Sequence, residues 1–265
     1  MSQRFDFYLP RDSWLHRLDP RTKLWAVLLF SVAALLFHSL AVLAGLLLLA
    51  HLALWAAKIP AERVRWLWLR LLPMLAMILV LQPLFAPGPG PDLVSLGPLR
   101  LTAAGLLSGL SFALRAATLA FLAAALLLTT ELNRLVQGLV KLGLPYPGGL
   151  TAALALRYLP TTYGLFVSIG EAQQARGWIV GQGGFVRRAR SYVPILVATI
   201  IAALRLSDSL ALALAARGLG YPARRTTLYE VRFGPADWAA VAVTTVAFAA
   251  LLAVRYGLGF GATPW

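Results

Sequence analysis

The sequence predicts an all-α integral membrane protein with about five transmembrane helices and a large cytoplasmic insert of amphipathic helices. Hydrophobic residues make up 60% of the chain and charged residues only 13%, against about 25% charged residues in an average soluble domain. Several apolar runs reach or approach the ~20 residues that a helix needs to cross a bilayer. The net charge of +14 comes from basic residues that flank these runs, which favours membrane topology and contact with anionic lipids over nucleic-acid binding.

The first two spans are predicted as a tight hairpin. Asp19-Pro20 is a helix start, because aspartate accepts backbone N–H bonds as an N-cap and proline fits the first helical position. Apolar segments follow at residues 24–37 and 40–57, separated only by His38-Ser39. Together they are too long for one helix, so we expect two spans, the first of them short.

Three further spans are predicted, at residues 71–85, 101–129 and 236–254. The first is interrupted by Pro73 and Pro83 and follows a basic, tryptophan-containing segment typical of the cytoplasmic membrane interface. Residues 86–98 form a loop rich in proline and glycine without positive charge, which we expect to be external.

The distribution of basic residues predicts the orientation. Of the 24 Lys and Arg residues, five lie in residues 1–23, four in 58–70 and twelve in 130–235. Because cytoplasmic loops carry the excess of positive charge, the N-terminus and the insert should be cytoplasmic and the C-terminus external. The predicted domains are therefore residues 1–129 with four spans, the cytoplasmic region 130–235, and residues 236–265 with the last span and an external tail.

The insert contains one short and two long predicted helices. Residues 131–143 place their apolar side chains on one face at helical spacing, with Thr130 as the expected cap. Residues 150–176 and 185–217 are longer, and each contains a proline that should kink it. An alternative topology makes both long stretches transmembrane, for seven spans. It would place four arginines outside, and the apolar run 193–204 has only 12 residues, so five spans are preferred.

The insert carries the same triplet twice, as Ala175-Arg176-Gly177 and Ala216-Arg217-Gly218, each at the end of a long predicted helix. Helix capping explains one such triplet, because a cation favours the negative end of the helix dipole and glycine stops the helix in a left-handed conformation. The repetition favours a second role. Lysine would serve the dipole equally well, whereas the planar guanidinium of arginine can also bind a carboxylate with two parallel hydrogen bonds.

Catalytic and metal sites are not predicted, and no cofactor is expected. The chain has no cysteine and no phosphate-binding G-x-x-x-x-G-K-[ST] loop, and its three histidines are scattered. Arg115, within a span, is expected to pair with a backbone carbonyl or a carboxylate inside the helix bundle. A self-contained secondary carrier or channel and an intramembrane enzyme remain as alternatives, each disfavoured by the scarcity of polar groups that such functions need.

With these motifs the chain resembles the transmembrane T component of energy-coupling factor (ECF) transporters, the EcfT/CbiQ family. The resemblance covers nearly the whole chain. Residues 15–24, Leu-His-Arg-Leu-Asp-Pro-Arg-Thr-Lys-Leu, are similar to the opening motif of that family. The two Ala-Arg-Gly triplets match its paired signature, and Arg224-Arg225-Thr226 follows the second triplet as in many members.

The resemblance implies a non-catalytic coupling subunit of an ABC-type importer in a prokaryotic cell membrane. Arg176 and Arg217 would dock, at the ends of coupling helices, into grooves of two ABC ATPase subunits that hydrolyse ATP. The small neighbours Ala175, Gly177, Ala216 and Gly218 would allow close approach. The coupling helices would pass the motion to a substrate-binding membrane subunit, the S component, which takes up a vitamin or a metal ion such as cobalt. No nucleic-acid partner is implied.

Overall fold

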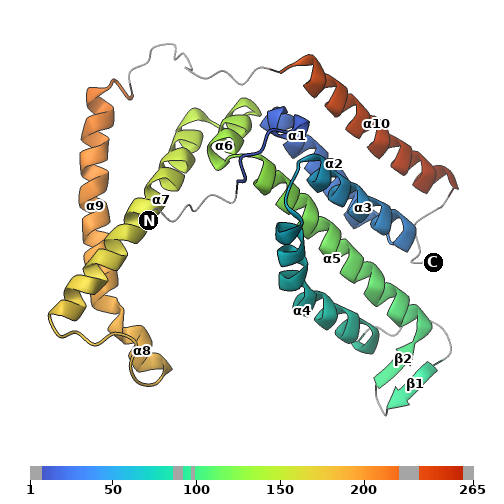
Figure 1. Ribbon diagram of the computed structural model, residues 1–265, viewed down its shortest axis with the longest axis horizontal. Helices are drawn as coiled ribbons and strands as arrows, with labels where there is room; N and C mark the ends of the chain where they lie inside the picture. Colours follow the sequence, from blue (N-terminus) through green and yellow to red (C-terminus); the bar gives the residue numbers. More distant parts are fainter. Residues whose placement is uncertain (1–7, 86–91, 97–98, 221–232, 259–265) are drawn as a thin grey trace. The chain divides into compact units, whose positions relative to one another are not determined.

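The computed structural model describes residues 8–85, 92–96, 99–220 and 233–258 of the chain. The described helices are α1 (Trp14–Arg17), α2 (Pro20–Leu36), α3 (Leu40–Ala56), α4 (Ala61–Phe85), α5 (Ala103–Thr129), α6 (Leu132–Lys141), α7 (Tyr146–Ala175), α8 (Phe185–Ser191), α9 (Val193–Ala216) and α10 (Pro235–Leu258) (Figure 1). One antiparallel hairpin joins β1 (Asp92–Leu96) to β2 (Leu99–Thr102). The predicted all-α membrane fold class is confirmed.

The chain divides into two compact units. One comprises Asp6–Leu144 with Val231–Trp265, which we call the bundle unit; the other is Pro145–Glu230, grouped with the first residues of the chain, which we call the insert unit. The bundle unit contains α1 to α6, the hairpin and α10. The insert unit contains α7, α8 and α9.

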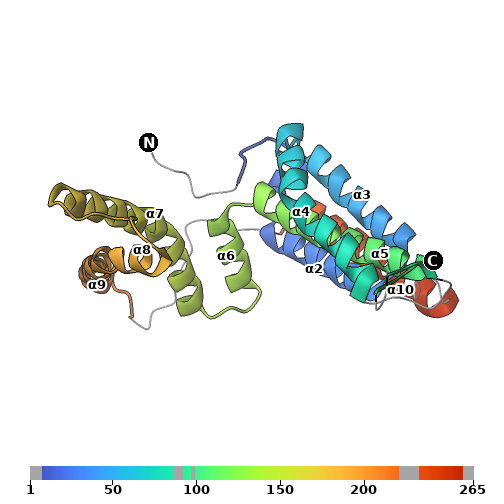
Figure 2. The same cartoon turned by 90° about the horizontal axis from the view of Figure 1, so that it is seen from below.

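The core of the bundle unit lies where α2 and α3 pack against α5 (Figure 2). Helix α3 buries Leu43, Leu46, Ala50 and Leu54, a spacing of three and four residues that keeps them on one face. Phe121 of α5 is fully buried and lies 4.4 Å from the ring of His51 and 5.0 Å from that of Trp68. Since lipid tails are as apolar as the side chains, such close packing replaces the hydrophobic effect as the main source of helix association.

Helix α4 continues through both of its prolines, where the sequence predicted an interfacial segment followed by an interrupted span. The buried Pro83 fits against two glycines of α5: a Cβ atom at Gly105 would lie 3.4 Å from the Pro83 backbone, and one at Gly109 would lie 3.1 Å from the Pro83 ring. Proline removes one backbone hydrogen bond, and the close approach of α5 covers this part of the helix.

Arg115 holds the turn between α2 and α3, which confirms its predicted pairing with backbone carbonyls. Its guanidinium donates to the carbonyl oxygens of Ala34 and Phe37, both at 2.9 Å. The Ser111 hydroxyl, one turn earlier in α5, donates to the His38 carbonyl at 3.0 Å. These carbonyls lie in the last turn of α2 or directly after it, where the helix offers no partner, so α5 satisfies them from the side.

Several local predictions are confirmed and several are wrong. Asp19 is the N-cap of α2 with Pro20 in its first turn, as predicted. Thr130 does not cap α6, which has Glu131 at its N-cap; instead the Thr130 hydroxyl accepts a hydrogen bond from Lys23. Part of the predicted loop 86–98 is instead a β-strand, because residues 92–96 pair antiparallel with residues 99–102, with a shift in register between Asp92 and Val94.

The predicted helix 185–217 is two helices, and its proline does not kink it. The chain breaks at Tyr192, and Pro194 lies in the first turn of α9, where the missing N–H has no helical partner to lose. Residues 185–216 form one of four described helical segments that are long and apolar enough to cross a membrane, with α4, α5 and α10. The length argument from the 12-residue run was therefore wrong, and the five-span topology stays a prediction.

Candidate functional site

The first Ala-Arg-Gly triplet forms the end of α7. Ala175 is the last helical residue, Arg176 is the C-cap and Gly177 has a φ of +84°. The N–H of Gly177 donates to the Gln174 carbonyl at 2.9 Å, and the N–H of Trp178 donates to the Gln173 carbonyl at 3.0 Å. This pair of bonds is the Schellman motif, in which the left-handed glycine reverses the chain and satisfies the last carbonyls of the helix.

The second triplet forms the same motif at the end of α9. Ala216 is the last helical residue, Arg217 the C-cap and Gly218 has a φ of +80°. The N–H groups of Gly218 and Leu219 donate to carbonyls three and five residues earlier, both at 2.9 Å. The two triplets thus agree in backbone conformation and hydrogen bonding as well as in sequence, and each is followed by a large apolar residue.

Two other helix ends show that this cap does not require arginine. Helix α6 ends with Leu142 as C-cap and Gly143 at a φ of +118°, and α3 ends with Ala57 as C-cap and Lys58 at a φ of +55°. Both ends form the two Schellman hydrogen bonds. The capping explanation of the triplets is therefore correct for glycine, but it leaves the choice of arginine unexplained.

The side chains of the triplets are exposed and available to a partner. All six residues are exposed, and neither Arg176 nor Arg217 forms an ion pair or a side-chain hydrogen bond with any residue that the structure describes. A Cβ atom at either glycine would have no neighbour within 4 Å. Hence the positive φ, rather than crowding, is what favours glycine at both positions.

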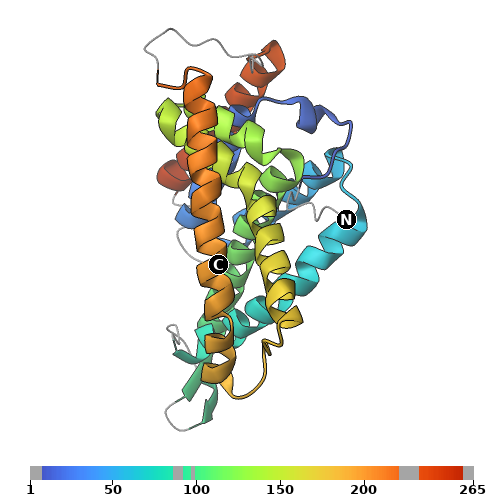
Figure 3. The ribbon, with the colours of Figure 1, turned by 90° about the vertical axis from the view of Figure 1, so that its left-hand side faces the viewer.

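The insert unit places the two arginines at opposite ends of a helix pair. Ile195, near the start of α9, packs its Cδ1 atom 3.8 Å from a Cβ position at Gly170, near the end of α7. The helices are therefore antiparallel (Figures 1 and 3). The 24 residues of α9 span about 36 Å, so Arg176 and Arg217 cannot enter the same groove of a partner.

The loop after the first triplet is fastened to α8. The indole N–H of Trp178 donates to the Ser191 carbonyl at 2.9 Å, and the Gly181 N–H donates to the Ser191 hydroxyl at 3.1 Å. These bonds give the chain after Arg176 a defined course, although its apolar side chains Trp178 and Ile179 are exposed.

In the bundle unit, the residues similar to the family's opening motif form a buried polar network. The side chain of Asp237, at the start of α10, accepts hydrogen bonds from the Asp19 N–H at 2.7 Å, the Thr22 hydroxyl at 3.1 Å and the Gly234 N–H at 2.9 Å. Lys23 donates to the Thr129 carbonyl at 2.8 Å at the end of α5. The network thus ties the N-terminal ends of α2 and α10 to the end of α5.

The side chain of His16 contacts residues nearer the start of the chain. Its ring nitrogens lie 2.7 Å from the Ser13 hydroxyl and 3.1 Å from the Leu9 carbonyl. Burial lowers the pKa of His16, although the bond to Leu9 opposes the shift.

Sequence analysis missed Asp237. The signal was an acidic residue in the first turn of an apolar helix, where the helix dipole favours negative charge.

Comparison with known proteins gives one consistent result. Residues 11–228 match the family CbiQ, described as cobalt transport protein. The chain is 34% identical over 254 residues to a protein of Heliobacterium modesticaldum (strain ATCC 51547 / Ice1), which covers 90% of this chain and 92% of the relative. It is 31% identical over 263 residues to a protein of Acidaminococcus fermentans, covering 95% and 96%. Both relatives are named energy-coupling factor transporter transmembrane protein EcfT.

Proposed function

This chain belongs to the EcfT/CbiQ family of transmembrane T components of ECF transporters, and we propose that it couples ATP hydrolysis by partner subunits to substrate uptake. Arg176 and Arg217 each dock into a carboxylate-lined groove of one of two ABC ATPase subunits. The insert unit then passes the movement of the ATPases to a substrate-binding S component in the membrane. The substrate class is a vitamin or a metal ion.

The observation that carries the proposal is the pair of matching arginines, neither of which pairs with a described residue. Both sit on the same backbone motif, both are exposed, and the same motif forms elsewhere in the chain without arginine. An arginine fork suits bidentate binding of a carboxylate, and the small residues on either side let a groove wall approach the backbone. Their separation along α9 supports two binding grooves, one on each of two subunits.

The exposed faces of the insert unit support contact with an apolar membrane partner. On α9 the exposed apolar residues recur at helical spacing: Val193, Leu196, Val197, Ile200, Ile201 and Leu204. On α7 Leu159 and Val167 are exposed as well. Contiguous apolar surface of this kind marks a protein or membrane interface. We assign it to the S component, because an apolar contact without ion pairs permits repeated release.

Removing both arginines tests the docking assignment. The double variant Arg176→Ala/Arg217→Ala should still insert in the membrane but lose ATPase association, because each charged pair at an interface contributes roughly tenfold or more in affinity. The measurement is recovery of ATPase subunits with the affinity-tagged protein after solubilisation in mild detergent. The matched control is Arg157→Ala/Arg205→Ala, which removes two exposed arginines from the middle of the same two helices. Full ATPase association and transport by the first variant would refute the assignment.

The cytoplasmic placement of residues 130–235 can be tested by labelling. A cysteine introduced at Gly184, which has open space around its Cβ position, should be protected from a membrane-impermeant maleimide in sealed cells. It should react after the membrane is permeabilised. Since the natural chain contains no cysteine, all labelling of the purified protein comes from the introduced one. Labelling in sealed cells would instead favour the seven-span topology.

A further inference from the structure

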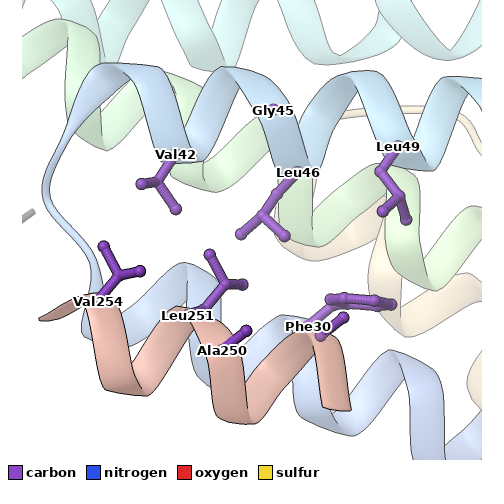
Figure 4. Close-up of a pocket in the computed structure, with 9 residues that line it drawn as sticks. Phe30, Val42, Gly45, Leu46, Leu49, Ala250, Leu251 and Val254 are labelled. Atoms are coloured by element: carbon purple, nitrogen blue, oxygen red, sulfur yellow. The ribbon is translucent and has the colours of Figure 1, made fainter. Parts of the chain in front are cut away.

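The bundle unit contains an apolar groove between α2, α3 and α10. It has a volume of about 420 Å³, within the range of about 300–1,000 Å³ typical of ligand pockets. Its walls carry only apolar residues, including Phe30 of α2, Leu46 and Leu49 of α3, and Leu251 of α10 (Figure 4). Gly45 of α3 also lines the groove, and a Cβ atom there would meet nothing within 4 Å.

One end of the groove leads to a cluster of cationic groups. Val42 and Val254 lie together at this end, beside the turn that joins α2 to α3 (Figure 4). Arg255, the next residue of α10, places its guanidinium 5.4 Å from the centre of the Phe37 ring in that turn. Arg115 donates to the carbonyl of the same Phe37, so two positive charges flank one residue.

The cluster has unused hydrogen-bonding groups and no negative partner among the described residues. Nη1 of Arg255 and Nδ1 of His38 are buried without a hydrogen-bond partner. Neither arginine forms an ion pair with a described carboxylate. Burial and then the charges of Arg115 and Arg255 lower the pKa of His38. A buried, unpaired guanidinium N–H is costly, and an anionic phosphate oxygen is an acceptor that suits it.

We propose that this groove binds one acyl chain of an anionic phospholipid, whose phosphate group is held by Arg255 beside His38 and Arg115. The apolar walls of the groove suit a hydrocarbon chain, and its cationic end suits a phosphodiester. A phospholipid carries these two groups one after the other, in the same arrangement. Val42 and Leu49 are separated by about 10 Å of helix. The groove therefore runs along about two turns of α3, with cationic groups at one end. The site is independent of the ATPase-docking arginines.

Lipid binding to the full-length chain tests the proposal. The protein, purified with its membrane partners and delipidated in mild detergent, is titrated with palmitoyl-oleoyl phosphatidylglycerol or with the phosphatidylcholine of the same chains, and bound lipid is counted by native mass spectrometry. We expect one phosphatidylglycerol per chain, bound about tenfold more tightly than phosphatidylcholine, since one charged hydrogen bond contributes about that factor. Equal binding of the two lipids would overturn the proposal.

Two variants test the contact with the lipid headgroup and the contact with the acyl chain separately. Arg255→Gln should abolish the preference for phosphatidylglycerol, whereas Gly45→Leu, which fills the groove, should weaken both lipids. The matched controls are Arg63→Gln, an exposed arginine on α4, and Gly164→Leu, a glycine of α7 with equally open space. If Gly45→Leu leaves lipid binding unchanged, the groove is not the site.

Two measurements distinguish the lipid from its competitors, a free anion and a partner helix. Glycerol phosphate, which has the phosphate without the chains, should not displace phosphatidylglycerol; displacement would mean that the cluster binds a free anion. A photoreactive probe attached to Gly45→Cys should crosslink to lipid. Crosslinking to another protein chain would show that a partner helix occupies the groove, and would overturn the lipid assignment.

Discussion

The bundle unit and the insert unit use similar apolar sequences in opposite ways. The largest fully buried hydrophobic side chains of the bundle unit, Phe37, Leu43, Leu54 and Phe121, meet in one core, and polar side chains of α5 and α10 bind the ends of α2. In the described part of the insert unit, Ile195 is the one large apolar residue buried to this extent. The first unit therefore holds its own shape, whereas the second presents its apolar residues to its surroundings.

This difference fits the proposed coupling role, which needs one rigid part and one movable part. A helix pair with few buried contacts has a low free energy of local opening or rearrangement, so binding of partners can shift its conformation. During such a change, the network around Asp237 and the contacts of Arg115 hold the helices of the bundle unit together. Matched substitutions in the two units test this difference.

The largest difference is expected from core truncation. Phe121→Ala removes a fully buried ring that contacts His51 and Trp68, and should lower the free energy of unfolding by about 3–5 kcal/mol. Ile195→Ala should leave the bundle intact and loosen only the contact of α7 with α9. Thermal unfolding in detergent measures the first effect, and hydrogen exchange of residues 146–216 measures the second. Equal losses of thermal stability would contradict the division into two units.

An intermediate difference in stability is expected between two aspartate variants, one in each unit. Asp237→Ala leaves the N–H of Asp19, the Thr22 hydroxyl and the N–H of Gly234 without their acceptor, which should cost about 2–4 kcal/mol. Asp208→Ala removes an exposed carboxylate of α9 that forms no ion pair with a described residue, so stability should change by less than about 0.5 kcal/mol. Comparable midpoints of thermal unfolding for the two variants would show that the buried network does not stabilise the bundle.

The smallest effect is expected at the helix ends. Lys58 has a φ of +55°, a conformation that costs a residue with a side chain roughly 1 kcal/mol, so Lys58→Gly should raise stability by up to about 1 kcal/mol. Gly143→Ala, at a φ of +118° in the same motif after α6, should lower stability by a similar amount. A small rise and a small fall in the unfolding midpoint would confirm that the backbone motif, independent of arginine, sets the strength of these caps.

Local features of the fold could be predicted where one short segment contains the whole cause. Asp19-Pro20 begins α2, and Gly177 and Gly218 end α7 and α9, because caps depend on a few consecutive residues. That Arg115 pairs with a carbonyl or a carboxylate followed from the cost of a charge in the bilayer, and the structure shows two carbonyls. The Thr130 cap and the Pro194 kink were wrong by a few residues, since each helix began at a different position than its apolar pattern indicated.

From the sequence alone follow the membrane class, the cap at Asp19 and the two arginine-bearing helix ends, because hydropathy and capping are local properties. The tertiary structure alone decided which distant groups meet. Asp19 and Asp237 are 218 residues apart and joined by a hydrogen bond, and the groove beside Arg255 is formed by three separate helices. No periodicity in one helix encodes the face that another helix will cover, so contacts between helices depend on how all of them pack together.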